Sequence, residues 1–179
     1  AGSQTSFVVG GGYTGSGSPA SETWDGSSWT EIAEMNTVRW AGGSAGADTE
    51  SFIAFGGNPN TTATETWNGS AWTEVADLNL ARHALAGSGS QTAAIGFGGN
   101  VSGPPYKSET EVWNGSSWTE VSDLNTGRTD VSGAGSSTAA LAFAGTITPP
   151  KTAATESWDG SSWTEVADLA TAKSSGAGQ

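Results

Sequence analysis

The sequence predicts an all-β fold built from several small, equivalent sheets, and three observations support this prediction. The eight-residue word WDGSSWTE at Trp24 returns with small changes at Trp67, Trp113 and Trp158. Its spacing of about 45 residues is typical of propeller blades and solenoid arrays. Each unit consists of strand-length segments separated by turn residues, without helical periodicity. Finally, the two ends of the chain carry complementary parts of one unit.

The unit that starts at His83 shows the expected elements in order. HALAGSGS is small and apolar, and QTAAIGFGGN ends in a glycine pair, so we expect strands A and B there. The Pro-rich loop VSGPPYKS follows, then ETEVWN as strand C, a tight turn, and SSWTEVSDLN as strand D. Four strands in about 45 residues match the size of a propeller blade.

The repeated word is the hairpin between strands C and D. Its Asx-Gly pair tolerates the positive φ that tight hairpins need, and the connection places the two tryptophans opposite each other. Because a sheet rich in Gly and Ala has little else to bury, we expect these pairs to pack between blades rather than to bind a ligand. The pairs are Trp24 and Trp29, Trp67 and Trp72, Trp113 and Trp118, and Trp158 and Trp163.

The ends of the chain predict how the blades divide. The opening AGSQTSFVVGGG matches strand B at 87–99, and the closing AKSSGAGQ matches strand A at 81–90. We therefore expect one domain, 1–179: a four-bladed β-propeller of four-stranded antiparallel blades, one of them shared by both termini. The expected blades are 1–36 plus 172–179, 37–79, 80–125 and 126–169. Small residues in the A segments favour a monomeric closed ring, with head-to-tail pairing of two chains as the alternative.

Composition and charge exclude several classes of function. The net charge of −12 makes nucleic acids and anionic membranes unsuitable partners. The absence of cysteine excludes disulfides and thiolate metal sites. No apolar run approaches the ~20 residues of a membrane-spanning helix. No nucleophile–base set, phosphate loop or metal cluster is visible, so we expect no enzymatic activity, no cofactor and no metal.

The repeat resembles the kelch motif of β-propellers. The pattern R…AAIGFGG…ETEVWN…W…VSDLN…R carries the arginine, the hydrophobic strand ending in Gly-Gly, and the glutamate two residues before an aromatic residue. The fourth unit departs from this pattern, with Ala144-Gly145 and Lys173. The acidic WNGSSW units are also similar to kelch-like propellers of bacteriophage virion and tail proteins, particularly marine ones. A weaker likeness to the Asp-box of sialidase-type propellers implies no activity.

The kelch resemblance implies that repeated acidic and basic residues pair. Each unit has a glutamate two residues before its first tryptophan and a basic residue after strand D. Because an active site occurs once, residues repeated in every blade are expected to be structural. The glutamates are Glu22, Glu65, Glu111 and Glu156, and the basic residues are Arg39, Arg82, Arg128 and Lys173.

Candidate binding residues lie where the units differ. The loops between strands B and C hold every proline, both tyrosines and both non-repeated lysines. In kelch-like propellers these loops share a face with the D–A connections, and their Tyr, Lys and Asn content suits a glycan or a protein. Ordinary variable surface loops are the alternative interpretation. The candidates are Tyr13, Trp40, Asn58, His83, Asn100, Tyr106, Lys107 and Lys151.

Together these patterns favour a non-enzymatic structural or recognition module of a virion or other extracellular assembly, which binds a protein partner through its B–C loops. The alternative is a lectin-like, glycan-binding propeller on a microbial surface. Loops that differ from blade to blade favour one asymmetric contact over a multivalent lectin.

Overall fold

The computed structural model describes residues 2–148 and 150–174, and these residues form four antiparallel sheets of four strands each. The strands of each sheet follow one another in chain order, and the described residues contain no helix. The prediction of an all-β chain with four four-stranded sheets arranged as blades is therefore confirmed.

The strand bounds follow the repeat. Blade 1 consists of β1 (Gly2–Ser3), β2 (Ser6–Tyr13), β3 (Gly17–Trp24) and β4 (Trp29–Ile32). Blade 2 consists of β5 (Gly43–Gly46), β6 (Phe52–Phe55), β7 (Thr64–Trp67) and β8 (Trp72–Val75). Blade 3 consists of β9 (Ala86–Ser90), β10 (Ala93–Phe97), β11 (Thr110–Trp113) and β12 (Trp118–Glu120). Blade 4 consists of β13 (Ser132–Ser136), β14 (Ala139–Phe143), β15 (Thr155–Trp158) and β16 (Trp163–Val166).

The Asx-Gly word forms the outer hairpin of every blade. In blade 1, Trp24 lies directly opposite Trp29, and Gly26 adopts a φ of 96°. The Oδ1 atom of Asp25 accepts hydrogen bonds from the backbone amides of Ser27 and Ser28, each at 2.8 Å. Hydrogen bonds from these two serines, led by the Ser27 hydroxyl, lower the pKa of Asp25 to about 2. Local hydrogen bonding thus holds the turn and sets the register of the two tryptophans.

Each blade has two different faces, and the core lies between blades. We call the face with the tryptophan pair the tryptophan face and the opposite face the aliphatic face. At the junction of blades 2 and 3, Ile53 and Phe55 of the aliphatic face pack against Trp113 and Trp118. The same arrangement joins blade 1 to blade 2 and blade 3 to blade 4. The tryptophan pairs therefore occupy the packing position that the sequence indicates for them.

A buried ion pair lies at each of these three junctions, between a basic residue in the connection that follows one blade and a glutamate in strand C of the next blade. The pairs are Arg39 with Glu65, Arg82 with Glu111, and Arg128 with Glu156. Every one of these six side chains is at most 2% exposed. The pairing that the kelch resemblance implies is therefore present wherever a junction between described blades exists.

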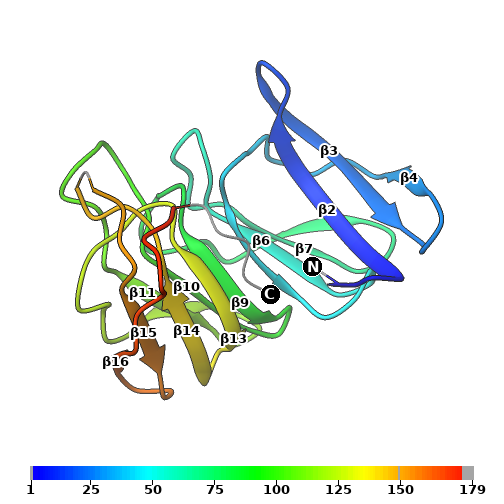
Figure 1. The fold of residues 1–179 in the computed structure, drawn as a ribbon. Helices are drawn as coiled ribbons and strands as arrows, with labels where there is room; N and C mark the ends of the chain where they lie inside the picture. The colour runs from blue at the N-terminus through cyan, green and yellow to red at the C-terminus, as the bar shows by residue number, and fades with distance from the viewer. Residues whose placement is uncertain (1, 149, 175–179) are drawn as a thin grey trace.

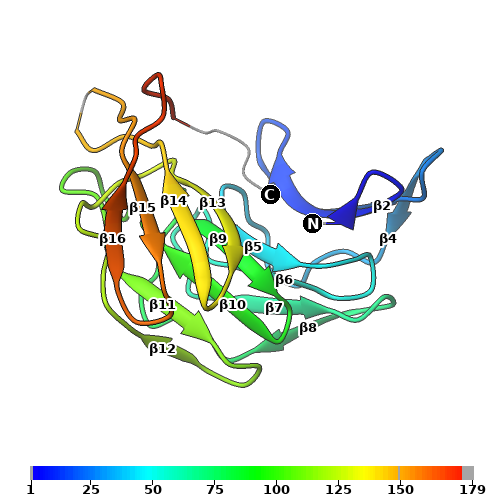
Figure 2. The ribbon, with the colours of Figure 1, turned by 60° about the horizontal axis from the view of Figure 1, so that its bottom comes forward.

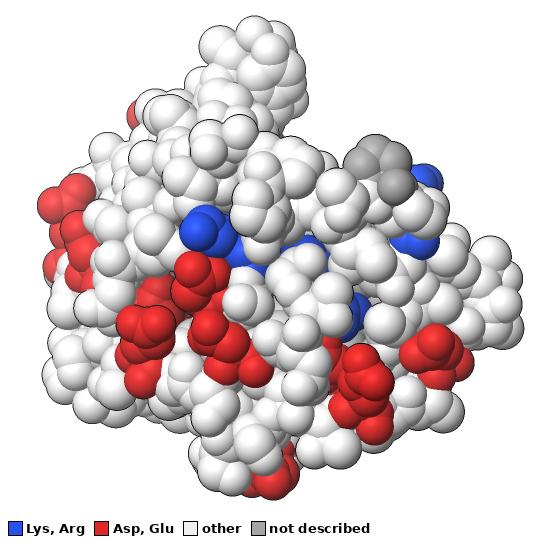
Figure 3. Space-filling view, turned by 90° about the vertical axis from the view of Figure 1, so that its left-hand side faces the viewer, with Lys and Arg blue, Asp and Glu red and all other residues white. Residues whose placement is uncertain are grey.

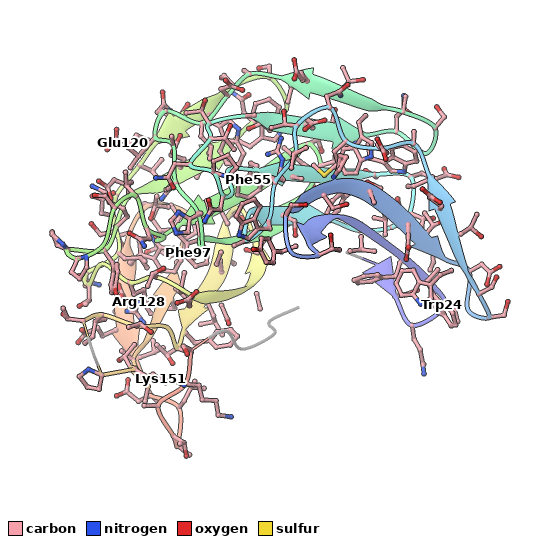
Figure 4. All side chains as sticks on the ribbon, turned by 90° about the horizontal axis from the view of Figure 1, so that it is seen from above. Trp24, Phe55, Phe97, Glu120, Arg128 and Lys151 are labelled. Atoms are coloured by element: carbon pink, nitrogen blue, oxygen red, sulfur yellow. The ribbon has the colours of Figure 1, made fainter. Side chains whose placement is uncertain are left out.

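The four blades form an open arc. The strands β5, β9 and β13 lie side by side along its inner edge (Figure 2). Figure 1 shows blade 1, in dark blue, standing away from blade 4, and Figure 4 places Trp24 and Lys151 at opposite ends of the arc. Blade 1 obtains its fourth described strand from Gly2–Ser3. The C-terminal strand is expected over 172–179; residues 175–179 of this segment lie outside the described residues, and Lys173 forms a bridge with Thr152 in the β14–β15 loop.

Candidate binding rim

The variable loops lie along one edge of the arc. The β2–β3, β6–β7, β10–β11 and β14–β15 loops all lie along the upper side of Figure 1. We call these four loops, together with residues 40, 83 and 129 of the D–A connections, the rim. Isolated β-bridges join the two kinds of segment in successive blades. The bridges are Trp40 with Asn58, His83 with Asn100, and Thr129 with Thr146.

An aromatic pair occupies the rim where blade 1 meets blade 2. Tyr13 is 61% exposed, and its ring centroid lies 5.2 Å from that of Trp40 at an interplanar angle of 49°. The backbone of Trp40 is fixed, because its amide donates to the carbonyl of Asn58 at 3.3 Å and its carbonyl accepts from the amide of Asn58 at 2.7 Å. Aromatic side chains fixed in this way present apolar surface and polar edges to solvent at low entropic cost.

A histidine–amide cluster follows at the junction of blades 2 and 3. The Nδ1 atom of His83 lies 2.5 Å from Oδ1 of Asn60, and Nε2 of His83 lies 3.5 Å from Nδ2 of Asn100. An imidazole protonated on Nδ1 satisfies both contacts, donating to Asn60 and accepting from Asn100. The Asn60 side chain also donates to the carbonyl of Val101 in the next loop. These contacts order the rim across two blades.

Of the remaining candidates, Tyr106 and Lys107 are less available to a binding partner, whereas Lys151 is exposed. Tyr106 is half-buried, and its carbonyl is close to Gly127. Lys107 forms an ion pair with Glu109 at 3.4 Å, while about a third of its side chain stays exposed. Lys151 is exposed and bridges Thr146 at the far end of the rim. The structure thus brings Tyr13 and Trp40 together, and His83 and Asn100 together, but it separates both groups from Lys151.

A cavity of about 260 Å³ opens between blades 1 and 2 below the aromatic pair. Trp40, Arg39 and the glycines of the β2 strand contribute to its lining. Small-molecule sites usually measure ~300–1,000 Å³, so this space is small for such a ligand. Contact across the surface of the rim therefore suits the structure better than deep insertion.

Acidic side chains cover more of one side of the molecule than basic ones do. Figure 3, which views the molecule from the left-hand side of Figure 1, shows several groups of acidic side chains and only small patches of Lys and Arg atoms. The arginines that repeat in the sequence are buried at junctions, where burial lowers the pKa of Arg82 and Glu111 opposes that shift. Among the described residues, no group of three or more His, Cys, Asp or Glu side chains could hold a metal ion.

Two sets of asparagine side chains that form contacts in the structure were not predicted from the sequence. Asn60 bonds to His83, and only proximity in the fold reveals this contact. A second set recurs three residues before each arginine, where the backbone and side-chain nitrogens of the asparagine donate to the junction glutamate. Its members are Asn36, Asn79 and Asn125, and Ala170 stands at this position in the fourth unit. The repeat itself contained that signal.

No protein-family model matches the sequence, and a search of curated proteins found no match. No helix in the described part of the chain is long and apolar enough to cross a membrane. The rim geometry and the sequence are therefore the basis for a functional proposal.

Proposed function

We propose that the protein is a non-enzymatic recognition module of a virion or other extracellular assembly, and that its four sheets are blades of a β-propeller which binds a partner through the rim. The observation that supports this proposal is that repeated and variable residues of each unit lie in different places. Repeated residues build the buried junctions, whereas the residues that differ between units gather on one rim. Partner-binding residues commonly occupy loops that a rigid scaffold positions.

A glycan is the partner that one specific observation favours. The exposed Tyr13 ring packs against Trp40, and the exposed side-chain amide of Asn60 lies further along the same rim. Aromatic faces pack against the apolar faces of sugar rings, and amides bond to their hydroxyls. A negatively charged protein suits neutral sugars better than acidic ones, because like charges repel.

A glycan array with the purified chain tests this proposal. Tyr13→Ser removes the exposed half of the aromatic pair, and Tyr106→Ser is the matched control in a half-buried loop position. Binding that Tyr13→Ser abolishes and Tyr106→Ser retains supports a glycan site at the pair. Binding that both variants retain places the site elsewhere on the protein. If the array shows no binding, a pull-down from an assembly that contains the chain tests for a protein partner with the same two variants. A partner that Tyr106→Ser retains and Tyr13→Ser loses supports a protein-binding site at the aromatic pair.

A further inference from the structure

The two ends of the arc expose two different sheet faces. At each of the three junctions, the aliphatic face of one blade packs on the tryptophan face of the next. Blade 1 therefore retains an uncovered tryptophan face, and blade 4 retains an uncovered aliphatic face, among the described residues. The internal junctions show what kind of surface covers each one.

The tryptophan face of blade 1 is built like its buried counterparts. Trp29 is 50% exposed, whereas Trp72, Trp118 and Trp163 at the same position are 6–7% exposed. The ring of Phe7 meets Trp29 edge-on at 6.2 Å, as Phe52 meets Trp72 at 5.7 Å. The aromatic set is thus assembled in blade 1 as in blade 2, but no neighbouring blade covers it.

The aliphatic face of blade 4 shows the complementary pattern. Leu141 and Val166 are each 42% exposed, whereas Ile53 and Ile95, at the repeat position of Leu141, are completely buried. Phe143 occupies the position of Phe55, whose ring packs edge-on against Trp118 of the next blade at 4.7 Å. A hollow of about 380 Å³ opens beside Leu141 on this blade. The aliphatic face of blade 4 thus has the kinds of residue that pack against a tryptophan pair at the internal junctions.

Charges at the two ends are also complementary. Lys173 stands at the repeat position of the junction arginines, and its carbonyl accepts the amide of Gly145 as that of Arg128 accepts the amide of Gly99. Glu22 stands at the repeat position of the junction glutamates. Both Lys173 and Glu22 are exposed, and no ion pair joins these two described residues. A cation thus marks one end of the arc, and a carboxylate marks the other.

We propose that these two ends are head-to-tail docking surfaces for a second copy of this chain. The tryptophan face of blade 1 in one copy covers the aliphatic face of blade 4 in the other, with Trp29 against Phe143. The Nε1 atom of Trp29 donates to Oγ1 of Thr155, because Trp118 and Trp163 donate to the corresponding threonines, each at 3.1 Å. Lys173 pairs with Glu22. Such a contact closes when two arcs complete a ring.

A second copy fits these surfaces better than the other end of the same chain. The three internal junctions determine the curvature of the arc, and with that curvature its two ends lie apart (Figures 2 and 4). Closure within one chain requires all three packed junctions to change, whereas a second copy covers both faces without changing any of them. The fourth unit also has Lys173 and Ala170 where the buried junctions have arginine and asparagine. These replacements remove hydrogen bonds and suit a junction that assembles reversibly.

The mass of the purified chain in solution tests the proposal, by sedimentation velocity or light scattering over a range of concentrations. We expect twice the 17.9 kDa of one chain at high concentration. Trp29→Ser and Leu141→Glu each damage one end, so either variant alone is expected to remain monomeric, with association more than about tenfold weaker. Ala71→Glu, in an exposed turn of blade 2, is the matched control and is expected to associate normally.

Mixing the two variants provides the decisive measurement. Trp29→Ser keeps an intact blade 4 face and Leu141→Glu keeps an intact blade 1 face, so an equimolar mixture is expected to regain the two-chain mass through one junction. Circular dichroism and melting of each variant show that the blades remain folded. A wild-type mass of one chain at every concentration overturns the proposal. A mixture that remains monomeric, or a wild-type dimer that both substitutions leave intact, also overturns it. None of these outcomes depends on the ligand of the rim.

Discussion

Replacing the buried Glu65 by glutamine is expected to destabilise the protein strongly. The Glu65 carboxylate is fully buried, and its two oxygens accept four hydrogen bonds. The donors are the backbone and side-chain nitrogens of Asn36 at 2.7 and 3.0 Å, the amide of Thr37 at 3.0 Å, and Nη2 of Arg39 at 2.6 Å. A glutamine of the same shape presents an NH₂ group to one set of donors and leaves Arg39 as a buried, unpaired cation.

The magnitude follows from that geometry. Removing one member of a buried ion pair typically costs ~3–5 kcal/mol, because the other charge stays buried without compensation. For a chain of this size, each kcal/mol lowers the melting temperature by ~2–4 °C, so Glu65→Gln is expected to melt roughly 6–20 °C below the wild type. Denaturant unfolding followed by tryptophan fluorescence measures the same change as a shift of the midpoint.

Glu22→Gln is the matched control, since Glu22 has the same repeat position but is exposed. Measured on the monomer, the unfolding free energy of Glu22→Gln is expected to change by less than about 0.5 kcal/mol. Replacing both partners, as Arg39→Met with Glu65→Leu, is expected to recover part of the loss, because no unpaired charge remains. Equal stability of Glu65→Gln and Glu22→Gln would refute the role assigned to the buried pair.

Three further predictions concern the turns, the tight backbone contacts and the core. Hydrogen bonds from Ser162 and Ser161 lower the pKa of Asp159 from 3.8 to about 2, so its stabilising effect is present above pH ~4 and is lost as the pH falls through 2. In Asp159→Asn, the fall in melting temperature between pH 4 and 2 is expected to be smaller than in the wild type; equal slopes would contradict this. Gly98→Ala places a Cβ 2.8 Å from a backbone oxygen at a φ of +69° and is expected to cost more than ~1 kcal/mol. Gly103→Ala, with open space around its Cβ, should cost less in the same denaturant assay. Phe97→Ala removes a fully buried ring that packs 4.9 Å from Trp163, with an expected loss of ~3–5 kcal/mol. Phe143→Ala, half-buried at the same repeat position, should cost clearly less when measured on the monomer.

Much of the architecture could be predicted because its causes are local and repeated. The Asx-Gly word predicts the outer hairpin, and the structure pairs Trp67 with Trp72 directly across it. The kelch resemblance implies that the repeated basic residue and glutamate pair, and the structure shows Arg82 and Glu111 as a buried pair. Because equivalent residues recur in successive units, each unit supports the same prediction independently.

The rim could be predicted only in outline. Variation between units indicates which loops differ, but spacing along the chain does not show that Tyr13 packs against Trp40 or that Asn60 contacts His83. Tyr106 and Lys107 have the composition of binding residues, yet packing and an ion pair with Glu109 reduce their availability. Such differences depend on side-chain orientation within each loop, which no repeat determines.

The sequence by itself determined the strands, the hairpins, the number of units and the packing role of the tryptophan pairs, because short-range hydrogen bonding and the pattern of apolar residues are encoded locally. Only the tertiary structure decided how the units are curved and which faces remain uncovered. Curvature results from the packing of whole side chains, such as Phe55 against Trp118, at three junctions at once. The exposure of Trp29 and Leu141 at the two ends of the arc is a consequence of that packing.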